Sequence, residues 1–121
     1  MQDKIKNFIK SYTELKAKKE ILDTIMRYSS DIKNKDEYSL LVIKIQIVES
    51  CLQILTSDER DIVFSHLINN LKWNEISEIY GEKLGMEFKY SERTFKRIQK
   101  SALSKIENFI YRNKFEAYIA A

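Results

Sequence analysis

Basic side chains recur at helical spacing near the end of the chain. Arg93, Arg97 and Lys100 are three or four residues apart and would share one face of a helix with Ser104, and Lys96 lies beside them. An arginine side chain can bond both acceptors of a guanine edge, and a lysine ammonium suits phosphate. The spacing therefore predicts a helix whose outer face binds nucleic acid. A solvated helix with scattered lysines is the alternative.

The same segment has an apolar face that would be buried in a core. Ser91 precedes the segment and is a typical N-cap residue, so we expect the helix to begin there and to extend as far as about Tyr118. Its first turn offers free N–H groups to a phosphate. The apolar face consists of Phe95, Ile98, Ala102, Ile106, Phe109 and Ile110.

Charge is distributed unevenly along the chain, although the net charge is only +3. Residues 56–86 contain three basic and six acidic side chains, whereas residues 87–121 contain eight basic and four acidic ones. Basic charge is thus concentrated on the predicted helix and on the segment before it. This polarity is typical of a surface that meets phosphate.

A shorter amphipathic helix, from about Trp73 to Tyr80, precedes the basic one and ends at Gly81. Two such helices in succession predict a helix-turn-helix, with the second helix in the DNA major groove. After Gly81, either the helix that begins at about Trp73 continues to Gly85, or residues 82–90 form a longer loop whose end could touch the DNA backbone. The candidate DNA-binding residues are Lys89, Tyr90, Ser91, Arg93, Thr94, Lys96, Arg97 and Lys100.

The sequence pattern predicts three further helices in the rest of the chain. Apolar residues recur at heptad-like spacing from about Asp3 to Tyr28, and again from about Asp36 to Leu55. A strand over residues 40–48 is a rival, because many residues there are β-branched. Thr56 with Glu59 predicts a capping box at the start of a third helix. We expect an all-α fold, with an antiparallel helical hairpin over residues 1–55 and a helix-turn-helix domain with a C-terminal helical extension over residues 56–121.

The predicted second helix has two adjacent apolar stripes, of which the first helix can cover only one. A large uncovered apolar surface is unusual in a monomer. We therefore expect a homodimer that buries one stripe between two hairpins, with closure onto the C-terminal domain as the alternative. The predicted dimer residues are Leu41, Ile45, Val48 and Leu52.

Residue types that support catalysis are scarce. The chain has one histidine, His66, one cysteine, Cys51, and no glycine-rich phosphate loop. We predict no enzyme activity, no metal site and no cofactor, and we expect His66 to be a packing or surface residue. A single cysteine, the absence of a signal-peptide pattern and the lack of a membrane-spanning apolar run are consistent with a cytoplasmic protein.

Residues from about Leu55 to Ile106 resemble region 4 of bacterial sigma factors, the module that reads promoters. The matching stretches are Glu59-Arg60, Trp73-Asn74-Glu75-Ile76 and Ala102-Leu103-Ser104-Lys105-Ile106. The whole chain resembles small phage and prophage proteins of the ArpU/RinA-like group. This resemblance implies a DNA-binding transcriptional regulator of phage or mobile-element type, with RNA polymerase as a possible partner.

Two features depart from the family pattern. The positions with which sigma factors read the −35 promoter element hold Glu92, Arg93 and Arg97, so we expect a different DNA target. Eight extra residues, 82–89, also separate Gly81 from Tyr90.

Two other functions remain open, namely a DNA-packaging subunit similar to small terminase subunits, and a helical adaptor of RNA polymerase that does not bind DNA.

Overall fold

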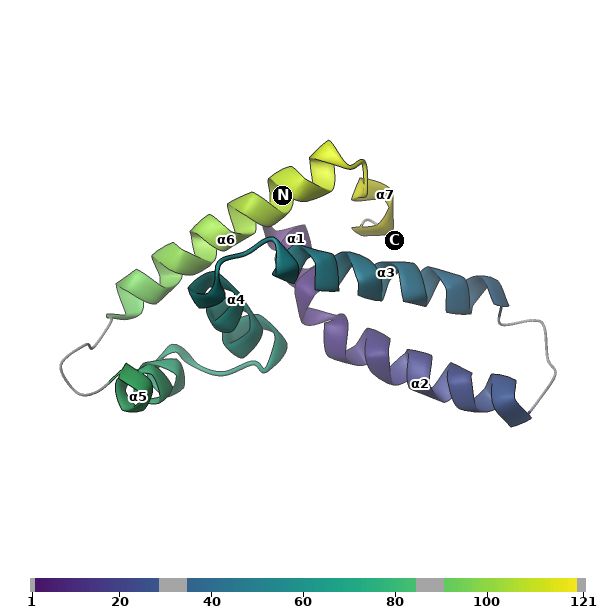
Figure 1. Ribbon diagram of the computed structural model, residues 1–121, viewed down its shortest axis with the longest axis horizontal. Helices are drawn as coiled ribbons and strands as arrows, with labels where there is room; N and C mark the ends of the chain where they lie inside the picture. Colours follow the sequence, from purple (N-terminus) through teal and green to yellow (C-terminus); the bar gives the residue numbers. More distant parts are fainter. Residues whose placement is uncertain (1, 29–34, 85–90, 120–121) are drawn as a thin grey trace.

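The computed structural model describes residues 2–28, 35–84 and 91–119 (Figure 1). All the regular elements of these residues are helices, which confirms the predicted all-α class, and residues 40–48 are helical. None of the described helices is long and apolar enough to cross a lipid bilayer. The elements are α1 (Gln2–Lys10), α2 (Tyr12–Tyr28), α3 (Lys35–Gln53), α4 (Ser57–Val63), the π-helical turn η2 (Phe64–Ile68), α5 (Trp73–Leu84), α6 (Glu92–Arg112) and α7 (Glu116–Ile119).

The predicted first helix is broken at Ser11, so the expectation of one continuous helix was wrong. The Ser11 hydroxyl donates a hydrogen bond to the Phe8 carbonyl oxygen at 2.5 Å, and its backbone N–H bonds to both Asn7 and Phe8. A serine that bonds the preceding turn competes with regular helix geometry. The break lets α1 pack against α6 and η2, while α2 pairs with α3.

Helices α2 and α3 lie side by side and run in opposite directions (Figure 1). Leu15 and Leu22 of α2 are buried in their shared core. The Tyr12 hydroxyl donates a 3.0 Å hydrogen bond to Glu49 Oε2 and so links the start of α2 to α3. Burial, and then the nearby Glu49 carboxylate, raise the pKa of Tyr12, so the phenol remains a donor at neutral pH.

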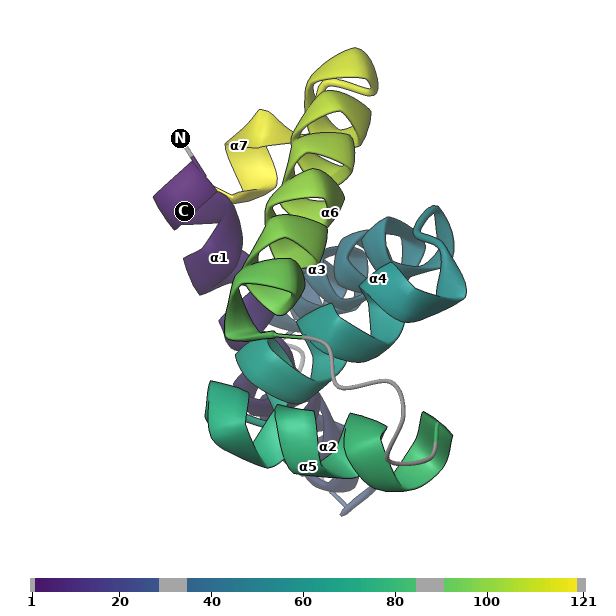
Figure 2. The same ribbon diagram turned by 90° about the vertical axis from the view of Figure 1, so that its left-hand side faces the viewer.

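The main core is continuous across the boundary that we expected at residue 55. It includes Ile9 of α1, Val48 and Cys51 of α3, and Ala102 and Ile106 of α6, all completely buried. Figure 2 shows α1 and α6 adjacent to each other, with α3 behind them. The expected division at residue 55 therefore does not divide the core.

The predicted dimer residues have a different role in this structure. Leu41, Ile45, Val48 and Leu52 are between 0% and 8% exposed in a single chain, because α2 and the C-terminal helices cover α3. They are not available as a surface for a second copy. Helix α2 packs most extensively on α3, and α6, which belongs to the C-terminal part that we considered as an alternative cover, also contacts it.

A smaller apolar cluster positions the start of α6. Ile62, Ile76, Tyr80 and Phe95 are buried together, and Leu71, Trp73 and Ile98 pack against them. The predicted contact among Trp73, Ile76, Phe95 and Ile98 is confirmed. The His66 ring stacks on Trp73 with centroids 3.7 Å apart, and its Nδ1–H donates to the Leu71 carbonyl oxygen at 2.9 Å. His66 is thus a packing residue, as expected.

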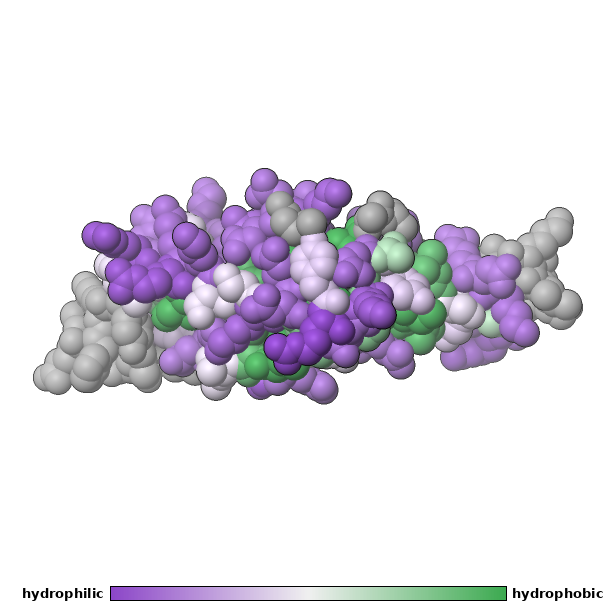
Figure 3. Space-filling view, turned by 90° about the horizontal axis from the view of Figure 1, so that it is seen from above, coloured by the Kyte–Doolittle hydropathy of each residue, from purple (hydrophilic) through white to green (hydrophobic). Residues whose placement is uncertain are grey.

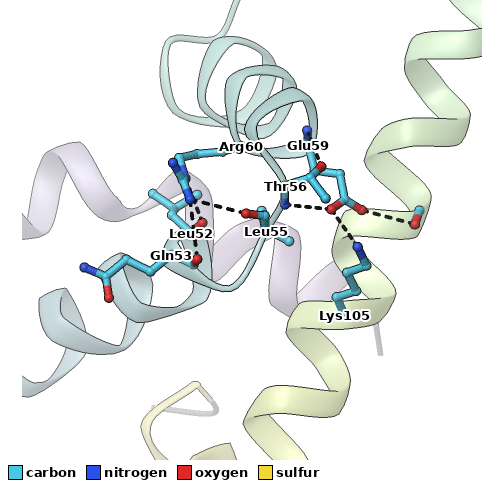
Figure 4. Close-up of polar contacts among 8 residues, drawn as sticks. Leu52, Gln53, Leu55, Thr56, Glu59, Arg60 and Lys105 are labelled. Carbon is cyan, nitrogen blue, oxygen red and sulfur yellow. Dashed lines mark hydrogen bonds and ion pairs between the residues drawn. The ribbon is translucent and has the colours of Figure 1, made fainter.

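The start of α4 is fixed to both α3 and α6 (Figure 4). The predicted capping box is present, because the Thr56 N–H donates to Glu59 Oε1 and the Glu59 N–H donates to Thr56 Oγ1. Arg60 donates to the carbonyl oxygens of Leu52, Gln53 and Leu55, which lie at the end of α3 and just beyond it. Glu59 and Arg60 therefore have clear structural roles.

The last helices differ from their predicted lengths. Helix α5 continues beyond Gly81 to Leu84, whereas the expected helix stop at Gly85 and the rest of the segment up to residue 90 lie outside the described residues. Helix α6 ends at Arg112 and does not reach Tyr118, because Lys114 adopts a left-handed conformation with φ of 61°. The Phe115 N–H then bonds the Ile110 carbonyl oxygen at 3.0 Å, which is the pattern of a Schellman C-cap. The short helix α7 follows.

Candidate nucleic-acid interface

Helix α6 has one face in the core and an opposite face at the surface. Helices α1, α3, α4 and α5 contact α6 and cover Phe95, Gln99, Ala102, Leu103, Ile106 and Ile110. The outer face carries the exposed side chains of Arg93, Lys96, Arg97 and Lys100, which we call the basic face. Seen from above α6, the surface is mostly hydrophilic (Figure 3). The predicted separation of basic and apolar faces is thus present in the structure.

Within the part of the chain that the structure describes, one cation of the basic face has an ionic partner. Lys96 Nζ lies 3.5 Å from Glu92 Oε1, but both side chains are more than half exposed, and such pairs contribute little to stability. Among the described residues, Arg93, Arg97 and Lys100 form no ion pair. Their charges are available to an anionic partner.

The first turn of α6 is capped as predicted. Ser91 Oγ accepts a 3.3 Å hydrogen bond from the Thr94 N–H, and it lies 3.1 Å from Thr94 Oγ1. Ser91 and Thr94 therefore stabilise the helix start, which fixes the position of the neighbouring Arg93. Lys89 and Tyr90, the other two candidate residues, lie outside the described residues.

Two of the helices that contact α6, namely α4 and α5, carry exposed charge of the opposite sign. Asp58 and Asp61 on α4, and Glu75 and Glu78 on α5, are partly or fully exposed. Such asymmetry orients the molecule in the field of a polyanion, with α6 directed toward it. Within the described residues, no group of three histidine, cysteine, aspartate or glutamate side chains is placed to hold a metal ion.

A cavity of about 300 Å³ lies beside the basic face, on the side where α1 meets α6. Sequence reasoning did not single out three of its residues, Gln2, Lys6 and Gln99. Nothing in the sequence connects Lys6 with the basic helix, but Gln99 is a polar residue within an apolar stripe and could have been noticed. The lining consists of Gln2, Lys6, His66, Trp73, Lys96, Gln99, Lys100 and Leu103, and we call it the seam cavity.

An apolar surface remains exposed on α2, away from the core. Ile21 is 61% exposed and Tyr28 80% exposed, and Ile25 and Met26 are also more than one-third exposed. Large apolar side chains that gather on one helix often mark an interaction surface. This outer face of α2 was not among the predicted dimer residues.

No protein-family model matches the chain, and no curated protein or solved structure is significantly similar to it.

Proposed function

We propose that this chain is a sequence-specific regulator of transcription that binds double-stranded DNA, of the phage or mobile-element type that its resemblance implies. The first half of α6 enters the major groove, where Arg93 and Arg97 contact base edges and Lys96 and Lys100 contact phosphates. The observation that carries this proposal is the basic face, with three exposed cations unpaired within the described residues. The buried opposite face of α6 supports it, because a rigid helix can hold these side chains in a fixed register.

A second copy of the chain completes the proposed DNA-binding unit. One recognition helix covers few base pairs, so specificity in such proteins comes from paired half-sites. We place the dimer contact on the outer face of α2, around Ile21 and Ile25. Glu20 and Arg27 are exposed on one flank of this face, seven residues apart. An antiparallel pairing of two α2 helices would bring Glu20 of each copy against Arg27 of the other.

Selection of bound duplexes from a random pool tests the proposed function. The expected result is one enriched motif, with two half-sites if the dimer binds, and an affinity that falls steeply as salt increases. Recovery of unenriched sequence would overturn the proposal. An adaptor of RNA polymerase would give no DNA retention at any salt concentration, and a packaging ring would have the mass of a large oligomer.

A further inference from the structure

The seam cavity combines cationic side chains from two helices that are far apart in the sequence. Lys6 comes from α1, whereas Lys96 and Lys100 lie one turn apart on α6. Like charges that line one cavity repel one another, and the i,i+4 arrangement of two lysines is itself unfavourable. Glu92 offsets this through its exposed pair with Lys96, but none of the residues that line the cavity is acidic. The cavity is therefore an attractive environment for an anion.

Gln99 provides a second, independent observation. Its side chain is only 6% exposed, and its Oε1 atom has no hydrogen-bond partner among the described residues. A buried polar atom without a partner destabilises a fold, so such an atom usually has a functional or structural reason. An ammonium group carries three donors. A lysine that turns inward to bind an anion could donate a second hydrogen bond to Gln99 Oε1.

The position of the cavity indicates which anion fits. An α-helix with its side chains is about 10–12 Å wide, and the major groove of B-DNA is about 12 Å wide. The two sugar-phosphate backbones therefore run along the flanks of a helix that lies in the groove. Lys96 and Lys100 lie on the flank of α6 that faces α1, and Lys6 of α1 lines the same cavity.

We propose that the seam cavity is a phosphate-binding site, formed by Lys6, Lys96 and Lys100, that holds a backbone phosphate of the bound DNA. This inference rests on the proposed function for the source of the phosphate, and α1 becomes a DNA-contacting element beside α6. A free phosphate ester, such as a nucleotide, would offer the same chemistry, and the experiment separates the two sources.

The decisive variant is Lys6→Gln, because Lys6 lies outside the basic face of α6. Its matched control is Lys10→Gln, which removes one exposed lysine from the same helix but outside the cavity. With the selected duplex, Lys6→Gln should weaken binding about three- to tenfold and reduce the slope of log affinity against log salt by about one. The control should leave that slope within experimental error. Equal slopes for Lys6→Gln and Lys10→Gln would overturn the DNA-phosphate site.

Trp73 reports on the cavity independently of DNA, because it is the only tryptophan and lines the cavity. Its fluorescence should respond to inorganic pyrophosphate or to AMP in the unmodified protein and not in Lys6→Gln. If these compounds bind through Lys6 but no duplex binds, the phosphate site stands with a small ester as its source, and the proposed function fails. The opposite outcome is also distinguishable. If duplex binds, Lys6→Gln leaves the slope of log affinity against log salt unchanged and neither compound changes Trp73 emission, then the phosphate site is wrong and the proposed function stands.

Discussion

The Lys105 ammonium of α6 donates a hydrogen bond to Glu59 Oε1 of α4 at 2.8 Å (Figure 4). The same carboxylate accepts bonds from the Thr56 N–H and the Ser101 hydroxyl. One side chain thus caps α4 and fixes the rotation of α6 about its axis. Because that rotation decides which residues of α6 are exposed, the Glu59–Lys105 contact also positions the basic face.

Replacing Glu59 with glutamine should destabilise the fold. The amide can still accept from Thr56, but the pair with Lys105 loses its charge, and charge-assisted hydrogen bonds are stronger than neutral ones. We expect a loss of about 1–3 kcal/mol in the free energy of unfolding, measured by urea denaturation. Glu14→Gln is the control, because its pair with Lys18 is exposed and should contribute less than about 0.5 kcal/mol. Equal midpoints for the two variants would contradict this role of Glu59.

Lowering the pH should remove the stabilisation that the Glu59 carboxylate provides. Burial raises the pKa of Glu59, but hydrogen bonds from Lys105 and Thr56 lower it by more than burial raises it. The net pKa therefore lies below the ordinary value of 4.5. When folding lowers the pKa of a carboxyl group, its ionised form stabilises the fold. This stabilisation is complete at pH values above the pKa of the unfolded state, and it is lost as the pH falls through the pKa of the folded state. Urea midpoints of the unmodified protein should therefore decrease below pH 4.5 more than those of Glu59→Gln. Parallel pH profiles would be inconsistent with the lowered pKa.

Substitutions on the basic face should separate base contacts from phosphate contacts. Arg93→Ala or Arg97→Ala should weaken binding to the selected duplex by about 1–3 kcal/mol and relax its specificity. Lys100→Ala should weaken all duplexes about equally and flatten the salt dependence. Fluorescence anisotropy with selected and scrambled duplexes measures both effects. Arg112→Ala, an exposed arginine in the last turn of α6, is the control and should bind normally.

Two aspartate substitutions test where copies of the chain meet. Ile45→Asp should unfold the protein, because it places a carboxylate in a core position that is 7% exposed. Ile21→Asp changes a residue that is 61% exposed, so it should keep the helical circular dichroism and give monomers in sedimentation equilibrium. Sedimentation of the unmodified protein as a monomer at about tens of micromolar would refute the dimer on α2.

Cys51 should be inert in the native protein. Its side chain is completely buried, and burial raises the pKa of its thiol to about 12. Because the thiolate is the reactive form, a thiol reagent should modify Cys51 only when the core opens. The reaction rate, followed by absorbance, should rise to that of a free thiol in denaturing urea. Rapid modification without denaturant would show that α3 separates easily from its neighbours.

Lys114→Gly should stabilise the end of α6. Lys114 occupies the left-handed position of the Schellman cap with φ of 61°, where a side chain costs about 1–2 kcal/mol and glycine has no such cost. Glycine also loses more conformational entropy on folding, so the expected net gain is about 0.5–1 kcal/mol in urea denaturation. Asn113→Gly, one residue earlier and not left-handed, should destabilise the protein or leave it unchanged.

Local chemistry made several features predictable from the sequence. The capping box of Thr56 and Glu59 and the N-cap of Ser91 depend on residues three positions apart, so spacing alone identifies them. The periodicity of apolar residues likewise predicted four of the six buried positions of α6, Phe95, Ala102, Ile106 and Ile110, because a helix repeats every 3.6 residues wherever it lies. It also predicted the contact of Trp73 with Phe95 but did not predict the burial of Gln99 and Leu103. The exposure of Arg93 and Arg97 on the opposite face follows from the same geometry.

Only the tertiary structure decided which surfaces these helices cover. The apolar stripes on α3 predict that Ile45 is buried, but they do not indicate whether α2, α6 or a second copy of the chain covers it. The break at Ser11 directs α1 onto α6 and thereby places Lys6 beside Lys100. Hydrophobic burial has no direction and is roughly proportional to area, so a sequence fixes which faces are buried and leaves their partners to the packing of the whole chain.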